Sequence, residues 1–197
     1  MAEILVLYYS PGGTTAEMAN IIAHGVENVD GMHARVRTVP DVSPNNKQTE
    51  DDLPAQGPLY ASNEDLIECA GVIMGCPTHF GNMPAAMKHF IDNTSSLWLS
   101  GKLAGKPAAV FSASTSMHGG QESTLLSMIL PWLHHGMLII GLPYTETALF
   151  TTQSGGSPYG ATRLTDDNKN AKITDDERKL CIALGKRVAM TAIKLIS

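Results

Sequence analysis

Three short segments combine glycines with hydroxyl, aromatic or histidine side chains, and each directly follows a run of apolar residues. The first consists of Ser10, Pro11, Gly12, Gly13, Thr14 and Thr15. Its glycines let backbone N–H groups approach a ligand, and the helix expected after them adds a partial positive charge. Such a segment can bind a phosphate group without any Lys or Arg. The alternative is a tight turn in which Thr14 caps the helix and Glu17 completes a capping box.

The other two segments suit a flat heterocycle that needs both stacking and hydrogen bonds. One spans residues 76–84 and includes Pro77, Thr78, His79, Phe80 and Gly81. By itself it is also compatible with an ordinary loop whose Phe80 packs into the core. The other spans residues 112–122 and includes Ser114, Thr115, Ser116, Met117, His118 and Gly119.

Short apolar runs that alternate with helical patterns are expected to position these segments. The apolar runs predict strands at residues 4–9, 34–39, 71–76, 108–112 and 136–140. The helical patterns predict helices around residues 18–26, near Asn63, at 85–92 and 122–133, and after Thr174, where Glu177 completes a capping box. Together they predict an α/β fold, a doubly wound five-stranded parallel sheet with helices on both faces. Ligands bind beyond the carboxyl ends of such strands, so we expect the three segments to meet there.

The composition indicates a single globular domain over residues 1–197, with an insertion-like segment at about residues 143–173. Of the 197 residues, 43% are hydrophobic and 17% charged, which is too apolar for a disordered chain. The net charge of −5 and the scattered Lys and Arg residues argue against a nucleic-acid partner. The three cysteines form no CxxC pair, which favours the cytoplasm and argues against a structural metal site. The first apolar run is too short for a membrane span.

Six motifs along the chain stand in an order that is specific to one family. They are Leu7-Tyr8-Tyr9-Ser10, Pro77-Thr78-His79-Phe80-Gly81-Asn82-Met83, Ser95 with Leu97-Trp98, His118-Gly119-Gly120-Gln121-Glu122, His134-His135-Gly136-Met137 and Pro158-Tyr159-Gly160-Ala161. In these motifs the chain resembles the WrbA family over nearly its whole length. Members of that family are flavodoxin-like, FMN-dependent NAD(P)H:quinone oxidoreductases. The resemblance implies FMN as cofactor, NADH or NADPH as co-substrate, a quinone as substrate, and a homotetramer (a dimer of dimers) whose neighbouring subunits complete each site.

The resemblance also implies roles for individual residues. Residues 10–15 would hold the FMN phosphate, residues 77–81 would border the ring and the ribityl chain, and residues 114–119 would wrap the other side of the ring. His134 matches a histidine that contacts the flavin. Trp98 matches an aromatic residue of the substrate pocket, where Phe80 would complete a stacking slot. Trp98 and His134 are therefore the candidate catalytic residues, although Trp98 alone is also compatible with a plain subunit contact.

The sequence departs from the family pattern at three places and leaves two other functions open. Position 79 is usually Arg in the family and is His79 here, and Pro11 and Gly12 replace an aromatic residue that members often carry. The third segment carries Met117 and His118, where members are richer in glycine and one residue shorter. The expected activity is a two-electron reduction of quinones by NAD(P)H, with ping-pong kinetics at one flavin face. The alternatives are a flavodoxin-type carrier of single electrons and a non-enzymatic binding partner that uses the same fold.

Overall fold

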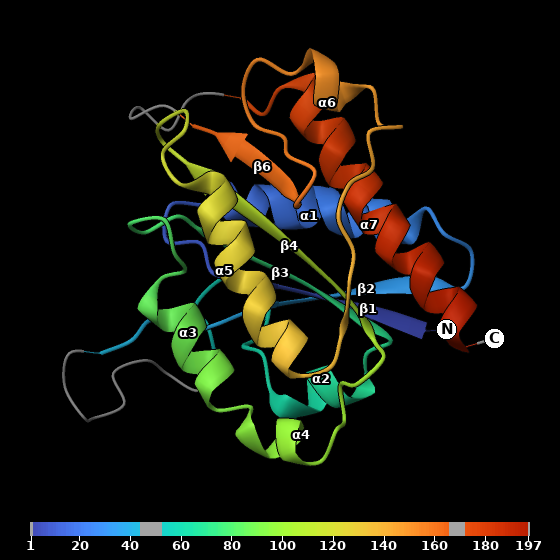
Figure 1. Ribbon diagram of the computed structural model, residues 1–197. Helices are drawn as coiled ribbons and strands as arrows, with labels where there is room; N and C mark the ends of the chain where they lie inside the picture. Colours follow the sequence, from blue (N-terminus) through green and yellow to red (C-terminus); the bar gives the residue numbers. More distant parts are fainter. Residues whose placement is uncertain (1, 44–52, 166–171, 197) are drawn as a thin grey trace.

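The computed structural model describes residues 2–43, 53–165 and 172–196, in which helices and strands alternate along the chain (Figure 1). Parts of the expected loop at residues 40–60 and of the segment at residues 143–173 lie outside the described residues. The elements are β1 (Ala2–Tyr8), α1 (Thr14–Glu27), β2 (Met32–Thr38), α2 (Asn63–Glu68), β3 (Gly71–Pro77), α3 (Ala85–Asp92), α4 (Ser95–Leu99), β4 (Pro107–Ser114), α5 (Gln121–His134), β5 (Leu138–Ile139), α6 (Ala148–Thr151), β6 (Ala161–Leu164) and α7 (Asp175–Ile196).

The strands form one parallel sheet in the order β2-β1-β3-β4-β5. This is the strand order of a flavodoxin-like sheet, in which a ligand site is expected where the order reverses between β1 and β3. The predicted α/β doubly wound fold is therefore confirmed. The structure adds a sixth short strand, β6, which pairs in parallel with β4 over Phe111–Ser114.

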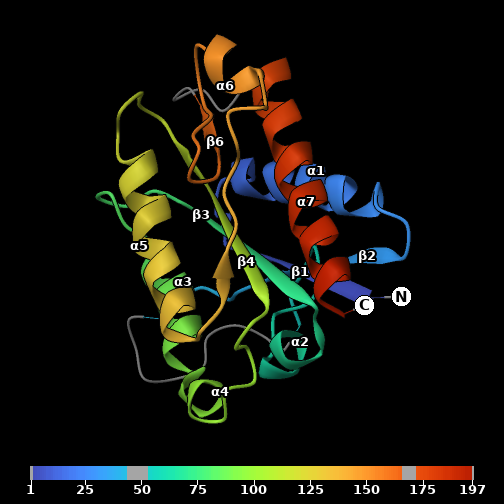
Figure 2. The same ribbon diagram turned by 45° about the vertical axis from the view of Figure 1, so that its right-hand side comes forward.

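Helices cover both faces of the sheet, and each face has its own apolar core (Figure 2). Helices α1 and α7 pack on one face, and α3 and α5 pack on the other. Successive residues of β1 alternate between the two cores, with Ile4 and Val6 on the α1–α7 side and Leu5 and Leu7 on the other side. This alternation explains why the sequence of β1 is a continuous apolar run, as expected of a strand buried on both faces.

Helices α1 and α7 approach each other closely because a glycine lies on each at the crossing. A Cβ atom on Gly25 would lie 2.3 Å from the Ile182 carbonyl oxygen, and one on Gly185 would lie 2.1 Å from the Ile22 carbonyl oxygen. Both distances are too short for any side chain. This contact fixes the position of α1, whose first two residues belong to the phosphate-binding candidate at residues 10–15.

The structure confirms one predicted capping box and corrects another. The Thr174 hydroxyl accepts the Glu177 N–H at 3.2 Å, and the Glu177 carboxylate accepts the Thr174 N–H at 2.9 Å. At α1, by contrast, the cap is Gly13 with φ 84°, and Thr14 is the first helical residue with no side-chain cap. The expected Thr14–Glu17 box is wrong, because the left-handed glycine ends the loop one residue earlier.

The helix around Pro131 is longer than expected. The sequence predicted a helix at residues 122–133, and a proline inside it would be expected to kink or shorten its end, yet α5 continues to His134. Backbone bonds of the last turn persist, since the His135 N–H donates to the Pro131 carbonyl at 3.0 Å. Pro131 lacks only its own N–H, so the helix loses one bond and keeps its direction far enough to present His134 at its end.

Candidate functional site

The three segments singled out by their residue types converge on one cavity of about 560 Å³ at the carboxyl edge of the sheet. This volume lies within the range of about 300–1,000 Å³ that is usual for small-molecule sites. The residues that line it are Ser10, Pro11, Gly12, Thr14, Pro77, Thr78, His79, Phe80, Ala113, Ser114, Thr115, Ser116, Gly119 and Thr165. We call this the loop cavity. Of the candidate residues in these segments, Gly13, Thr15, Gly81, Met117 and His118 do not line it.

The first loop presents bare backbone to the loop cavity. A Cβ atom placed on Gly12 or Gly13 would meet no other atom within 4 Å, so open space lies in front of this backbone. The Ser10 hydroxyl accepts the Ala16 N–H at 3.0 Å and satisfies one of the first-turn donors of α1. Among the described residues, the N–H groups of Thr14 and Thr15 have no hydrogen-bond partner. Two unsatisfied amides at a helix N-terminus are suited to a phosphate group.

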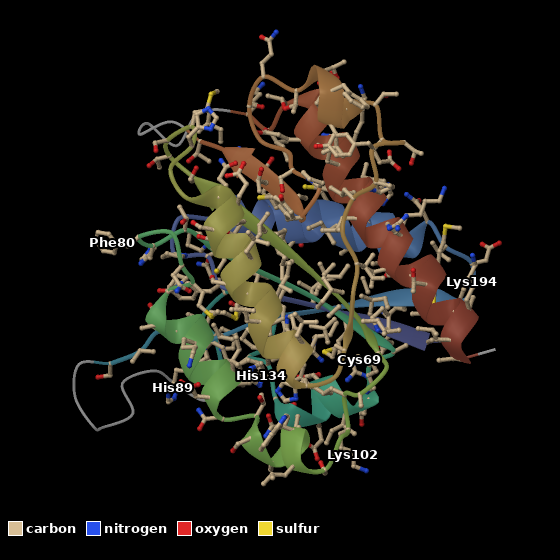
Figure 3. The ribbon with its side chains drawn as sticks, viewed as in Figure 1. Cys69, Phe80, His89, Lys102, His134 and Lys194 are labelled. Atoms are coloured by element: carbon tan, nitrogen blue, oxygen red, sulfur yellow. The ribbon has the colours of Figure 1, made fainter. Side chains whose placement is uncertain are left out.

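The second loop is held as a tight, left-handed turn. His79 and Asn82 exchange two backbone hydrogen bonds, at 2.8 and 3.0 Å, and both Phe80 (φ 52°) and Gly81 (φ 74°) have positive φ. This turn points the Phe80 ring away from the body of the protein, where it is fully exposed (Figure 3). The alternative in which Phe80 packs into the core is therefore wrong. A non-glycine residue with positive φ is strained, and such strain is most often found at functional sites.

The second and third loops touch each other through glycine. A Cβ atom on Gly120 would lie 2.8 Å from the Cα of Gly81, so only glycine allows this approach. The Thr78 hydroxyl lies 2.5 Å from that of Thr124 and donates to the Gly120 carbonyl at 3.2 Å. These bonds tie the end of β3 to the start of α5 and fix the width of the loop cavity.

The third loop is ordered by side-chain amide and hydroxyl groups. The Gln121 side-chain amide donates to the Ser114 hydroxyl at 2.8 Å, and Ser114 donates to the Ser116 carbonyl at 2.8 Å. Met117 lies half-exposed at the tip of the loop, and His118 has a positive φ of 58°. The loop thus keeps its hydroxyl-bearing side along the cavity and turns Met117 towards solvent.

Trp98 and His134 lie together, but away from the loop cavity. They line a small hollow of about 220 Å³ with Asp92, Thr94, Ser95 and neighbouring residues, and this hollow shares no residue with the loop cavity. Helix α5 runs from the third loop to His134 over 14 residues, which corresponds to about 20 Å. Figure 3 shows Phe80 and His134 well apart. Within one chain, the candidate catalytic residues therefore do not reach the loop cavity.

The histidine next to His134 has a structural role. The ring of His135 is buried, and its Nε2 lies 2.9 Å from the Thr94 hydroxyl at the base of α4. Burial lowers the pKa of His135, and the nearby His134 lowers it further. Through this hydrogen bond His135 links the end of α5 to the segment that carries Trp98.

The buried thiols take no part in the loop cavity. Cys76 lies at the end of β3, where its thiol contacts the sulfur of Met128 at 3.3 Å, and burial raises the pKa of this thiol. It is the small buried thiol that its position in the sequence indicated. Over the described ranges, no group of three or more His, Cys, Asp or Glu side chains could hold a metal ion. No helix in those ranges has the length and apolar character needed to cross a bilayer.

Two residues beside the loop cavity were missed by the sequence analysis. Thr165 lines the cavity, and its N–H donates to the Ser114 carbonyl at 2.8 Å. Arg163, on β6, forms an ion pair with Glu17 in the first turn of α1. No local pattern distinguished β6, because it is four residues long and its partner β4 lies far away in the sequence. Only the final motif, which ends at Ala161, hinted that this stretch belongs to the site.

The residues present fit FMN. The amide-lined end at Thr14 and Thr15 suits a phosphate, and the space between the second and third loops suits a flat ring system. Thr78, His79 and Ser116 supply polar groups along that space.

Comparison with known proteins points to the same cofactor. A family model described as NADPH-dependent FMN reductase matches residues 2–148, and so ends before β6 and α7. The chain is 39% identical over 202 residues to a protein named NAD(P)H dehydrogenase (quinone) from Trichlorobacter lovleyi, with 99% of both chains covered. It is also 39% identical over 201 residues to a protein of the same name from Rhizobium rhizogenes, with 100% of both covered.

Solved structures share the fold. A flavodoxin, WrbA-like protein from Agrobacterium tumefaciens superimposes with a TM-score of 0.68 at 23% identity, covering 98% of this chain and 99% of that one. A flavodoxin from the domain Archaea superimposes with a TM-score of 0.64 at 20% identity, covering 97% and 99%. At these identities the likeness supports the flavodoxin-like architecture alone.

Proposed function

The chain belongs to the NADPH-dependent FMN reductase family, and we propose that within it the chain reduces quinones to hydroquinones at the loop cavity, with ping-pong kinetics. The resemblance to the WrbA family is confirmed, and so is the assignment as an NAD(P)H-dependent flavin oxidoreductase. The physiological quinone and the kinetic order belong to the proposal. FMN, when bound, supplies the two-electron redox chemistry between NAD(P)H and the quinone.

One observation carries the proposal: the three loops converge on a single cavity, and the N–H of Thr14, which lines that cavity, has no hydrogen-bond partner among the described residues. The N–H groups of Thr14 and Thr15, together with residues 10–13, would hold the phosphate. Residues 77–81 would border one side of the ring, and residues 114–119 the other. Because no Lys or Arg of the described residues lines the loop cavity, the amides and the α1 dipole would provide positive potential there.

The shape of the loop cavity supports the kinetic order. Phe80 lines the loop cavity and is fully exposed, so this aromatic surface is open to solvent. Two flat substrates that need the same stacking surface would have to bind there one after the other. NAD(P)H would bind and leave as NAD(P)⁺ before the quinone enters, and this order is the basis of ping-pong kinetics.

We further propose that neighbouring subunits complete each site in a homotetramer, a dimer of dimers. Trp98 is half-exposed beside the more exposed Leu99, and α5 presents a row of exposed leucines at Leu126, Leu130 and Leu133. An apolar surface of this extent is typical of a subunit interface. Because α5 places His134 about 20 Å from the third loop, and Trp98 lines the same hollow as His134, a second copy would have to bring these residues to the cavity of its neighbour.

The three free, buried cysteines are compatible with the proposed cytoplasmic location, where thiols stay reduced.

The test is a steady-state assay of NADH oxidation with benzoquinone and FMN. Parallel double-reciprocal lines at several quinone concentrations, with activity that depends on FMN, would support the proposal. Intersecting lines would contradict the ping-pong order. Slow one-electron transfer to a protein acceptor, without quinone turnover, would favour an electron carrier, and activity or binding that is independent of FMN would favour a binding module.

A further inference from the structure

An arginine outside the loop cavity pairs with a carboxylate in the first turn of α1, the helix that begins at this cavity. Arg163 comes from β6, and its guanidinium forms an ion pair with the carboxylate of Glu17. The arginine side chain is only 5% exposed, whereas that of Glu17 is 48% exposed. A buried cation that reaches a half-exposed carboxylate in the first turn of α1 calls for an explanation.

The position of Glu17 poses an electrostatic conflict. Glu17 is the fourth residue of α1 and lies about 4.5 Å along the helix axis from Thr14, the first helical residue. A carboxylate in the first turn stabilises an empty helix through the dipole. The same carboxylate would repel a phosphate dianion that approaches the Thr14 and Thr15 amides, since like charges raise each other's energy. Without a counter-charge, Glu17 would oppose the binding that the loop is built for.

The position of Arg163, whose positive charge pairs with Glu17, is fixed by the sheet. In the β4–β6 ladder Arg163 lies opposite Ala113, and it shares a face of β6 with Ala161, which packs in the α1–α7 core. The Arg163 carbonyl accepts the side-chain amide of Gln121 at 3.3 Å, and that amide also donates to Ser114. The arginine is thus anchored to the strand and loop that line the loop cavity, while its side chain reaches α1.

We infer that Arg163 is a positioning residue for the cofactor phosphate: by pairing with Glu17 it neutralises the one carboxylate of the first α1 turn and leaves the loop amides attractive to a dianion. This inference rests on the proposed function, since it concerns the same site. The inference also assigns a role to the segment after residue 143, because this segment contributes Arg163. Removing Arg163 would leave an unpaired negative charge next to the phosphate and would act on the phosphate rather than on the ring.

The experiment measures the dissociation constants of FMN and of riboflavin, which lacks the phosphate, by quenching of flavin fluorescence. Arg163→Gln is expected to weaken FMN binding about tenfold at low salt, the size expected for an unscreened like charge near the site. Riboflavin binding should not change. Raising the salt concentration should reduce the FMN effect, and Arg163→Lys, which keeps the charge, should restore most of the affinity.

Two further variants separate electrostatics from packing. Glu17→Gln should bind FMN at least as tightly as the unaltered chain, and the double variant Glu17→Gln/Arg163→Gln should recover the affinity lost in Arg163→Gln. Arg187→Gln on the exposed side of α7 removes the same charge elsewhere and should have no effect. Thermal unfolding of each variant shows whether the fold is retained.

The outcomes distinguish this inference from the proposed function. If Arg163→Gln weakens FMN and riboflavin equally, or if the double variant does not recover, Arg163 only holds the fold together and the inference is wrong. If the unaltered chain binds FMN and Arg163→Gln binds it equally well, the inference fails alone. If the unaltered chain binds riboflavin and FMN with equal affinity, or binds neither, the phosphate site itself is absent and the proposed function fails as well.

Discussion

The loop cavity and the hollow at Trp98 differ in how complete each is within one chain. The loop cavity is enclosed by three loops whose turns are fixed by glycines, positive φ angles and short hydrogen bonds. The hollow at Trp98 is smaller, shallow and bordered by exposed apolar side chains. Under the proposed function, this difference predicts that the single chain binds the cofactor, whereas quinone turnover depends on the assembly. A change in one region should therefore affect one property and spare the other.

The largest effect is expected from separating the second and third loops. Gly120→Val would place a Cβ atom 2.8 Å from the Gly81 backbone and would also strain a φ of 97°. We expect the affinity for FMN to fall by a factor of about 30 or more, as measured by fluorescence titration. Gly105→Val is the matched control, because its φ is 81° but open space surrounds it. Equal FMN binding by the two variants would contradict a preformed loop cavity.

The next effect concerns the exposed row of leucines on α5. Leu130→Glu places a charge in the middle of this row, which should dissociate the assembly into smaller species visible by light scattering. Quinone turnover should fall about tenfold or more, because Trp98 and its neighbours would no longer reach the stacking site of the adjacent subunit. FMN affinity should stay unchanged. Leu195→Glu, an equally exposed leucine on α7, is the control. A dissociated variant with full turnover would show that one chain suffices.

A smaller effect is expected from the indole ring itself. Trp98→Ala removes one stacking surface and should lower kcat/KM for benzoquinone about fivefold to tenfold, which corresponds to one aromatic contact. Trp98→Phe should keep most of the activity, and both variants should bind FMN like the unaltered chain. Unchanged kinetics in Trp98→Ala would leave Trp98 as a subunit contact only.

The smallest effect comes from pH. Burial lowers the pKa of His135 from its usual 6.5, so near and below that pH the unfolded chain binds more protons at this residue than the folded one. The free energy of unfolding should therefore fall as the pH drops below about 6.5. Thermal melts of the unaltered chain and of His135→Gln test this, since the variant should lose that part of the pH dependence. Because His135 supports the Trp98 segment, quinone turnover should decline at a higher pH than FMN binding does.

The elements of the fold were predictable because their signals are local. Five strands and most helices followed from apolar runs and helical spacing, and β3 begins at Gly71 as expected. The cap of α1 was mispredicted because Gly13 and Thr14 are both acceptable helix starts, and the choice between them depends on how the loop meets α1. Phe80 is apolar and could equally have packed in the core. Only the left-handed turn at residues 80–81 directs its side chain outwards.

The sequence by itself determined the alternation of strands and helices, the three ligand-binding loops and the family motifs, since each depends on residues close together in the chain. The tertiary structure decided that β6 joins the sheet beside β4, that Arg163 meets Glu17 across 146 positions, and that Trp98 and His134 lie away from the loop cavity. Such placements depend on the packing of α1, α5 and α7 against the sheet. No local pattern encodes them, because the free energy that selects them comes from burial shared among distant segments.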